Sequence, residues 1–281
     1  MVSPDKEFLG KEEIASVYYH NFFNYPLNAN EIIKWSARIS GPSMSSITSV
    51  LSKNGYFFVK GREGLIYKRA LRERISDRKI KIAKKIASIL AQIPTVLGVF
   101  ITGALAMKNA EEESDIDLMI ITKANTLWIS RLISYLVIWL LGFKIRKPGN
   151  TSQKDKLCIN IWLDEAVLSW SKNDRNFYSA HEIAQIVPII NKNKIYQRFL
   201  QKNKWILNYW PRAVKILSAK DIKLKVQKPE HFISLLNTLT FKMQYFYMKS
   251  KITREVVALH KAIFHPKDWG KEVLDKLKLC L

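Results

Sequence analysis

The sequence has few cysteines and no apolar segment at its start. Its 281 residues include two cysteines, Cys158 and Cys280, which lie far apart in apolar surroundings. This usage favours a reduced intracellular protein without a disulfide framework or a zinc site. The first residues, MVSPDKEFLGKEE, contain no apolar core of a secretion signal, so we expect a cytoplasmic location.

Long apolar runs are also missing. The most membrane-like segment, Leu127–Phe143, has about 17 residues and contains Arg131, whereas a spanning helix needs about 20 apolar residues. We expect a buried helix here and no stable insertion into a membrane. Membrane association is a weaker interpretation that depends on this segment and on the charge.

Acidic residues are scarce beside basic ones. The chain has 24 Asp and Glu against 46 Lys and Arg, which gives a formal net charge of +22 and an isoelectric point near 9.9. A surplus of this size favours contact with polyanions, meaning nucleic acid, nucleotides or anionic lipid. RNA or DNA is therefore a candidate partner through the basic surface, although such a surface also serves solubility.

The amino-terminal region is typical of short helices followed by a hairpin. The segment KEEIASVYYHNFFNYPL spaces its apolar residues for a helix that ends at Pro26. Asn28 and Glu31 then form a capping-box pattern, which predicts the start of a second helix. We expect a third helix over Met44–Asn54, and the β-rich runs on either side of the Gly61–Gly64 turn predict a hairpin.

This order of elements resembles a winged helix-turn-helix domain over about residues 8–68. The resemblance implies that the third helix enters a nucleic-acid groove. Packing or a protein contact is an equally good interpretation. The third helix is rich in Ser, and Lys53 is its only basic residue, which argues against strong readout of bases.

A basic helix is expected over Ala70–Pro94. Its apolar residues recur at helical spacing along one stripe: Leu71, Ile75, Ile82, Ile86 and either Ile89 or Leu90. The rest of its surface carries cations: Arg72, Arg74, Arg78, Lys79, Lys81, Lys84 and Lys85. We expect these cations in solvent, and they are our first choice for a sequence-independent contact with a phosphate backbone.

From Val96 the pattern becomes strand, turn, helix and strand, in the runs VLGVFIT, GALAMKN and DIDLMIIT. A long apolar helix is expected from Asn125 to Leu141, followed by two short strands in FKIRK and KLCINIWL. After Glu165 the spacing indicates helices nearly to the end of the chain, in FYSAHEIAQIVPII, KIYQRFLQKNKWILNYW, HFISLLNTLTFKMQYFYMKS and TREVVALHKAIF.

Two aspartates lie inside one of these apolar strands. Asp115 and Asp117 are two residues apart, so their side chains project to the same side. Like charges held this close repel unless a cation compensates them, and a divalent ion such as Mg²⁺ could bridge the pair to substrate phosphates. Gly103, between a strand and a helix, lets backbone N–H groups approach an anion. Together these residues predict a phosphate-plus-metal site.

The stretch TGALAMKNAEEESDIDLMII resembles the Gly-Ser then Asp-x-Asp signature of the polymerase-beta-like nucleotidyltransferase superfamily, over about residues 95–165. The resemblance implies a small core with two aspartates on one strand and a third carboxylate on a later strand. It also implies Mg²⁺ or Mn²⁺ ions that position an NTP, attack of an acceptor hydroxyl on the α-phosphorus, and loss of pyrophosphate. Asp115 and Asp117 would then be catalytic and metal-binding, and the backbone at Gly103 and Ala104 would hold phosphates.

Two positions depart from that signature. Ala104 stands where the superfamily usually has Ser, which removes a hydrogen bond to phosphate of about 1 kcal/mol. The strand KLCINIWLDE has Asn160 where the third carboxylate is expected. Asp164 lies on the same face by alternation and could substitute, so both residues are candidate metal ligands.

Two cations near the signature are candidates to pair with a triphosphate. Lys123 follows the aspartate strand and Arg131 lies on the next helix, although a solvated or core-edge cation is the more ordinary role for each. The segment SAHEIAQ contains His181 and Glu182 but lacks the second His of a zinc-peptidase helix. We expect His181 to be a structural or surface residue.

These patterns predict an α+β protein with a winged-helix-like domain (1–69), a basic connecting helix (70–94), a mixed-sheet nucleotidyltransferase core (95–168) and a helical domain (169–281). The leading hypothesis is metal-dependent transfer of a nucleoside monophosphate from an NTP to a hydroxyl of RNA, protein or a small molecule. The alternative is a catalytically silent, nucleotidyltransferase-like protein that binds nucleic acid or regulates. Metal-dependent NTP turnover, as against salt-sensitive duplex binding, distinguishes the two.

Overall fold

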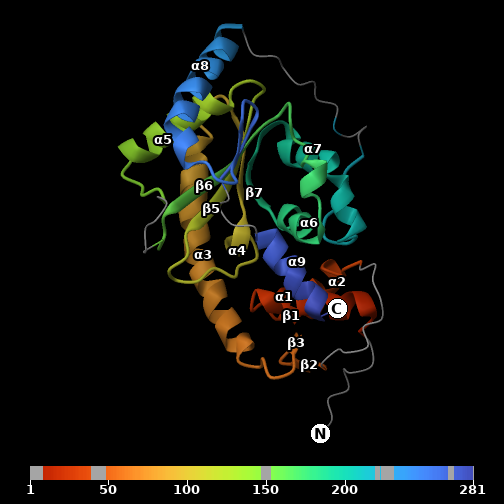
Figure 1. Cartoon of the computed structure of the whole chain (residues 1–281). Helices are drawn as coiled ribbons and strands as arrows, with labels where there is room; N and C mark the ends of the chain where they lie inside the picture. The colour runs from red at the N-terminus through yellow and green to blue at the C-terminus, as the bar shows by residue number, and fades with distance from the viewer. Residues whose placement is uncertain are drawn as a thin grey trace.

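The computed structural model describes residues 9–38, 49–146, 153–218, 222, 231–264 and 269–280. The chain forms a mixed α+β fold, as predicted, with a six-stranded sheet between helices and a smaller three-stranded sheet near the amino terminus (Figure 1). The central sheet has the strand order β7-β4-β5-β6-β9-β8. Its strands are β4 (Val96–Ile101), β5 (Ile116–Thr122), β6 (Leu157–Asp164), β7 (Val187–Asn191), β8 (Val256–Ala258) and β9 (Lys261–Ile263).

The middle of the sheet is mixed in direction. Strands β4 and β5 are antiparallel, whereas β5 and β6 are parallel and are joined through the helix α5 (Leu127–Leu140). Every residue of β4 is buried, and so is nearly every residue of β5. Strands covered on both faces are expected to be continuous apolar runs, so a partly exposed Asp inside β5 is an exception that needs a cause.

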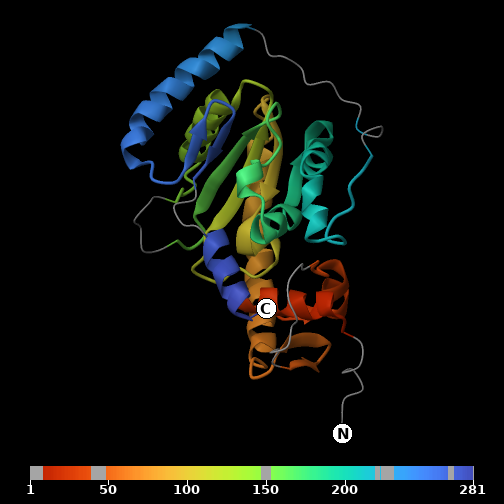
Figure 2. The same cartoon turned by 45° about the vertical axis from the view of Figure 1, so that its right-hand side comes forward.

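Helices cover both faces of the sheet (Figure 2). Helix α3 (Leu65–Leu90) and α5 pack with Ile116, Leu118 and Ile120 of β5 in one apolar cluster. The other face carries Met119 and Ile121 of β5. It packs with α6 (Phe177–Ala184) and α7 (Ile195–Lys202). Asp117 shares the parity of Met119, so it points to the α6 side.

The amino-terminal part begins with α1 (Lys11–Phe22) and is packed against the same cluster as α6. Its other elements are β1 (Leu27–Asn28), α2 (Ala29–Lys34), β2 (Val50–Lys53) and β3 (Tyr56–Val59). The capping box predicted at Asn28 is confirmed, since its side chain accepts from the Glu31 N–H and the Glu31 carboxylate accepts from the Asn28 N–H.

The third helix and the hairpin turn of this part were predicted wrongly. Residues 50–53 form strand β2 instead of the end of a helix over Met44–Asn54, and residues 44–48 lie outside the described residues. The β2–β3 hairpin turns at Asn54 and Gly55, not at Gly61–Gly64. Both turn residues have positive φ, +53° and +75°, as an Asn-Gly hairpin turn requires.

Helix α3 starts at Leu65, earlier than the predicted Ala70, and its apolar stripe is only partly buried. Leu71 is exposed, whereas Arg69 and Lys79 are buried. Arg69 is held by two hydrogen bonds of 2.7 Å to the Glu31 carboxylate. Burial of these cations is tolerated because each one is paired, so a count of apolar residues alone misplaces the buried face.

The region after Glu165 contains strands where helices were predicted. Residues Val187–Asn191 form the edge strand β7, and the segment from Val256 to Ile263 forms the β8–β9 hairpin. Short apolar runs fit either structure, and an edge position admits Pro188. FKIRK contributes one bridge, at Ile145.

The other described helices are α4 (Gly103–Ala106), α8 (His231–Met248), α9 (Trp269–Cys280) and the 3₁₀ segments Lys172–Asp174, Lys192–Lys194, Lys204–Asn208 and Lys249–Lys251.

Helix α5 was expected to be buried, and its outer face is exposed. Leu136, Trp139 and Leu140 lie on that face, while Trp128 and Ile138 are buried against the sheet. Among the described residues, no helix combines the length and the apolar character that crossing a membrane would require.

Candidate functional site

The site is built around the start of strand β5. Asp117 is the second residue of the strand and Asp115 immediately precedes it. In the described residues, a ligand atom of each aspartate and the Cys158 Sγ all lie within 4.8 Å of one another. Cys158 sits opposite Asp117 on β6, so the apolar setting predicted for this cysteine is wrong.

Gly103 brings the backbone of the preceding strand against Asp117. The Thr102 N–H donates to the Asp117 carbonyl at 3.1 Å, and Gly103 has a φ of +61°. A Cβ at Gly103 would lie 2.8 Å from Asp117 Oδ2. Glycine is therefore required for two reasons: the backbone is left-handed, and the nearby carboxylate leaves no room for a Cβ. The start of α4 is held beside Asp117 as a result.

Strand β6 supplies Asn160 to the site. Its Nδ2 donates to Asp117 Oδ1 at 3.3 Å, and its Oδ1 is buried without a hydrogen-bond partner. A bulge lies at Asn160, because Leu118 pairs with Ile159 while Met119 pairs with Ile161. A bulge adds one residue to a strand and changes the side-chain alternation beyond it.

Asp164 is not in the site, because it lies at the opposite end of β6. Simple alternation placed Asp164 on the face of Asn160, but it lies six residues beyond Cys158 along β6, about 20 Å away in a strand. Its fully buried carboxylate accepts from the backbone N–H groups of Asn125 and Ala166 and contacts His260 Nδ1 at 3.0 Å. Asp164 organises the opposite end of the sheet.

Glu182 is the carboxylate that sequence reasoning missed. It lies on α6, in the wall of a cleft that Asp117 also lines, and accepts a hydrogen bond of 2.7 Å from Gln185 Nε2. Burial first, and then the charge of Asp117, raise the pKa of Glu182 to about 8. The sequence signal was a single acidic residue in the helical segment SAHEIAQ, and only the packing of α6 on the sheet places it at the cleft.

The electrostatics of the cluster favour a cation. Burial, followed by the charge of Asp115, raises the pKa of Asp117 to about 7. Arg146 compensates in part, because its Nη1 lies 2.8 Å from Asp115 Oδ2. Burial also raises the pKa of the Cys158 thiol. Asp115 and Asp117 thus lie together, Glu182 lines the cleft that Asp117 also lines, and the exposed Arg146 guanidinium contacts Asp115.

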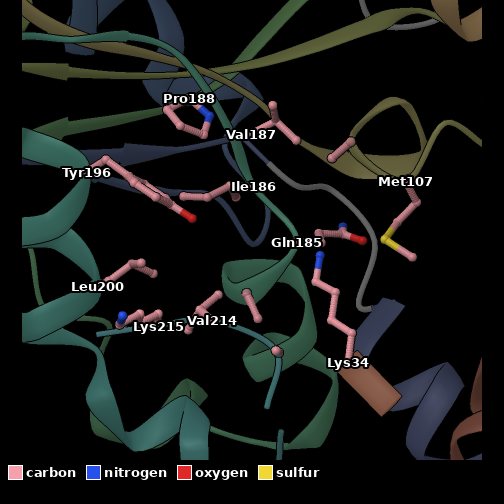
Figure 3. Close-up of a pocket in the computed structure, with 13 residues that line it drawn as sticks. Lys34, Met107, Gln185, Ile186, Val187, Pro188, Tyr196, Leu200, Val214 and Lys215 are labelled. Atoms are coloured by element: carbon pink, nitrogen blue, oxygen red, sulfur yellow. The ribbon is translucent and has the colours of Figure 1, made fainter. Parts of the chain in front are cut away.

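The cleft next to Asp117 has a volume of about 310 Å³. Its lining comprises His20, Phe23, Tyr25, Gly103, Ala104, Met107, Asn109, Asp117, Tyr178, His181, Glu182, Gln185 and Trp269. A second pocket of about 340 Å³ shares Met107 and Gln185 with it, and Figure 3 shows Lys34 extending toward Gln185 there. Lys34 and Lys215 are the cations in the wall of this second pocket.

Lys123 and Arg131 are placed elsewhere. Lys123 follows the far end of β5, where its N–H donates to the Thr95 carbonyl. The Arg131 guanidinium lies over the rings of Tyr135 and Phe264. Neither cation belongs to the described lining of the cleft. Arg131 packs between α5 and α8, where it donates to Gln244 Oε1, so it has the role of a cation at the edge of the core.

Basic residues of α3 hold the loop that leads into Asp115. The Lys79 Nζ donates to the carbonyl oxygens of Glu112 and Ser114 at 3.0 and 2.8 Å, and to Asp155 at 2.7 Å. Arg78 pairs with Glu112 at 3.0 Å. The expectation of a wholly solvated basic face is therefore wrong, since part of this face is paired with acidic residues of the chain.

Two buried histidines line part of the cleft. His20 of α1 and His181 of α6 are 3.1 Å apart between their Nε2 atoms, and His20 Nδ1 contacts the Ser16 carbonyl at 2.8 Å. Burial is the main cause that lowers the pKa of His20 to about 4 and of His181 well below its usual value. His181 is a structural residue that joins two helices, one of the two predicted roles.

Comparisons with known proteins give no relative for this chain. No protein-family model matches it, no curated protein matches it, and no solved structure matches it.

Proposed function

We propose that the protein is a metal-dependent nucleotidyltransferase that moves a nucleoside monophosphate from an NTP to an acceptor hydroxyl. The observation that carries the proposal is that Asp115 lies beside Asp117, and that Asp117 and Glu182 line one cleft, with the Gly103 backbone against Asp117. Two-metal enzymes that transfer phosphoryl groups use such carboxylate clusters, because divalent ions stabilise both the attacking and the leaving oxygens.

The residues present fit Mg²⁺ or Mn²⁺. Hard carboxylate and amide oxygens are the ligands that these ions prefer, and Asn160 Oδ1 is a buried oxygen without a partner beside Asp117. Asp115, Asp117 and Glu182 would hold the ions, with Asn160 Oδ1 as a further donor. Bound there, the ions would lower the pKa of the acceptor hydroxyl and neutralise charge on the leaving pyrophosphate.

The chain's own groups then orient the substrate. The backbone at Gly103 and Ala104 faces the carboxylates and would approach the triphosphate, while Arg146 would exchange its Asp115 contact for a phosphate oxygen. Helix α4 has only four residues, so its dipole adds little, and Ala104 offers no hydroxyl. We therefore assign most of the phosphate contact to Arg146 and backbone N–H groups.

In the reaction, the acceptor oxygen forms a bond to the α-phosphorus and the bond to the β-phosphate oxygen breaks. Pyrophosphate carries away that electron pair. The hydroxyl proton passes to a carboxylate of the cluster.

A second candidate is a catalytically silent protein that binds nucleic acid. Asn160 in place of a carboxylate favours it, as does an amino-terminal order α1-β1-α2-β2-β3 with the sheet order β1-β3-β2, which supports the winged-helix resemblance. Of the segment expected to enter a groove, residues 44–48 lie outside the described residues and residues 50–53 form strand β2. Glu182 weighs against this candidate, because it supplies the third carboxylate that Asn160 lacks.

The test is transfer of label from each α-labelled NTP, with Mg²⁺ or Mn²⁺, to total cellular RNA and protein. We expect incorporation by the natural protein and a loss of at least about 10²-fold in Asp117→Asn, since transition-state charge is then left uncompensated. Asp77→Asn is the matched control, because Asp77 is exposed on α3 and pairs with Lys108 at the surface.

Transfer that persists in Asp117→Asn would contradict the proposed chemistry. No transfer by the natural protein, together with duplex binding that falls steeply with salt, would favour the silent candidate.

A further inference from the structure

Helix α8 has an inverted arrangement of polar and apolar residues. Its buried positions are polar: Asn237 Oδ1 accepts from the Trp128 N–H at 2.7 Å, and Gln244 Nε2 donates to the Trp128 carbonyl at 2.9 Å. Its exposed side carries an apolar stripe at spacings of three and four residues: Phe232, Leu235, Leu239, Met243 and Phe246. Helices of globular proteins normally turn such a stripe to the core.

The neighbouring helix enlarges this apolar surface. Helix α5 packs against α8 and exposes Leu132, Leu136, Trp139 and Leu140, with Trp139 70% exposed and Phe246 72% exposed. Figure 2 shows α8 along the outer edge of the molecule. Exposed large apolar side chains gathered on two packed helices are typical of a surface that contacts another apolar phase.

The charge of both helices selects among apolar partners. Residues 118–154 and residues 231–254 contain no Asp or Glu. The cations on α8 or just after it are Lys242, Lys249, Lys251 and Arg254. Lys242 and Lys249 are exposed on or beside α8, and the Lys249 ammonium lies 4.5 Å from the centre of the Phe246 ring.

We propose that the α5–α8 surface docks in the interface of an anionic lipid bilayer. Aliphatic and aromatic side chains would enter the boundary between the headgroups and the acyl chains, and the lysines would contact the anionic headgroups. Interfacial amphipathic helices bind membranes in this way. Binding a second copy of the chain would bring two cationic surfaces together, which is unfavourable. Binding a nucleic-acid phosphate backbone would leave the apolar side chains of Leu235, Leu239 and Met243 without an apolar partner. The inference is independent of the proposed nucleotidyl transfer.

The experiment is flotation of the full chain with vesicles of phosphatidylcholine, alone or mixed with phosphatidylglycerol. We expect binding to the anionic vesicles and weaker binding to the neutral ones. The double variant Lys242→Gln/Lys249→Gln should lose on the order of 30-fold in affinity, since each lysine near the surface contributes about a factor of five. Added salt should weaken the natural protein in the same direction.

A second double variant tests the apolar half. Leu239→Ser/Phe246→Ser changes two exposed side chains, so the fold should persist in a thermal melt while vesicle binding falls at least about tenfold. The matched control is Tyr67→Ser, a 78% exposed aromatic on α3, which should bind as the natural protein does.

Three results would overturn the proposal. They are no flotation with anionic vesicles, equal flotation of the Leu239→Ser/Phe246→Ser variant, and a dimer in sedimentation that this variant dissociates. The last result would assign the surface to a second copy of the chain.

Discussion

Glu182 distinguishes this site from a pair of aspartates that merely ends a strand. It lies on a different element, α6, and lines the same cleft as Asp117. Gln185 orients it with a hydrogen bond of 2.7 Å. An uncompensated carboxylate in this setting costs stability, because burial and Asp117 both oppose its charge. A residue retained at such a cost is a strong candidate for function.

We predict that Glu182→Gln separates stability from activity. The folded protein keeps a proton on Glu182 that the unfolded chain releases above its usual pKa of 4.5, so this residue lowers stability as the pH rises toward about 8. The neutral amide avoids that loss and should raise the free energy of unfolding above pH 8 by up to about 5 kcal/mol. Transfer activity should fall about 10²-fold.

Thermal melts at several pH values and the labelled-NTP assay measure the two effects. Glu63→Gln, at an exposed position, is the control and should change neither. If Glu182→Gln kept full activity, Glu182 would be a packing residue outside the reaction.

Some of the individual site residues could be predicted from the sequence and others could not. Asp115, Asp117 and Gly103 came from a local signature, and the structure brings them together because strand, turn and strand are adjacent in the chain. Asp164 was predicted wrongly because it lies at the opposite end of β6 from Asp117, and alternation along a strand says nothing about distance along it. Lys123 and Arg131 failed because nearness in sequence does not fix the direction of a side chain.

At the scale of elements, α1 and α6 meet through the His20–His181 pair. His20 is fully buried and its pKa is lowered to about 4, so it stays neutral in the folded protein while the unfolded chain takes up a proton below about 6.5. The unfolded state then binds more protons between these values. Stability is present above pH 6.5 and is lost as the pH falls toward 4.

We predict that His20→Asn reduces this acid sensitivity. The natural protein should lose up to about 3 kcal/mol through His20 between pH 6.5 and 4, and the variant should lack that part of the slope. Urea unfolding across this range measures it, with His231→Asn, an exposed position on α8, as the control. Identical slopes for natural protein and His20→Asn would show that His20 does not control this transition.

Elements were predictable where local signals were complete. The capping box at Asn28 and the strand-helix-strand around Gly103 needed no partner to be recognised. The β2–β3 hairpin carried an equally local signal, Asn54-Gly55, which the helical spacing of the residues before it outweighed. Strands β7, β8 and β9 were not predictable in this way, because short apolar runs become strands only when a sheet edge accepts them.

At the scale of the whole molecule, the cleft is assembled from segments far apart in sequence. Helix α1 supplies His20, strand β5 supplies Asp117, α6 supplies Glu182 and α9 supplies Trp269. One apolar cluster contains residues of α1, the sheet, α6 and α9 (Figure 1). A site of this kind depends on the complete fold, which explains why the sequence showed one strand of it and missed the wall opposite.

The most direct measurement is binding of Mn²⁺, read by electron paramagnetic resonance, with and without a non-hydrolysable NTP analogue. It needs no knowledge of the acceptor, so it tests the carboxylate cluster itself. We predict that the natural protein binds Mn²⁺, that the analogue tightens binding, and that Asp117→Asn and Glu182→Gln each weaken it at least about tenfold while Asp77→Asn does not. Equal Mn²⁺ binding by Asp117→Asn and the natural protein would contradict a metal–nucleotide site at this cleft.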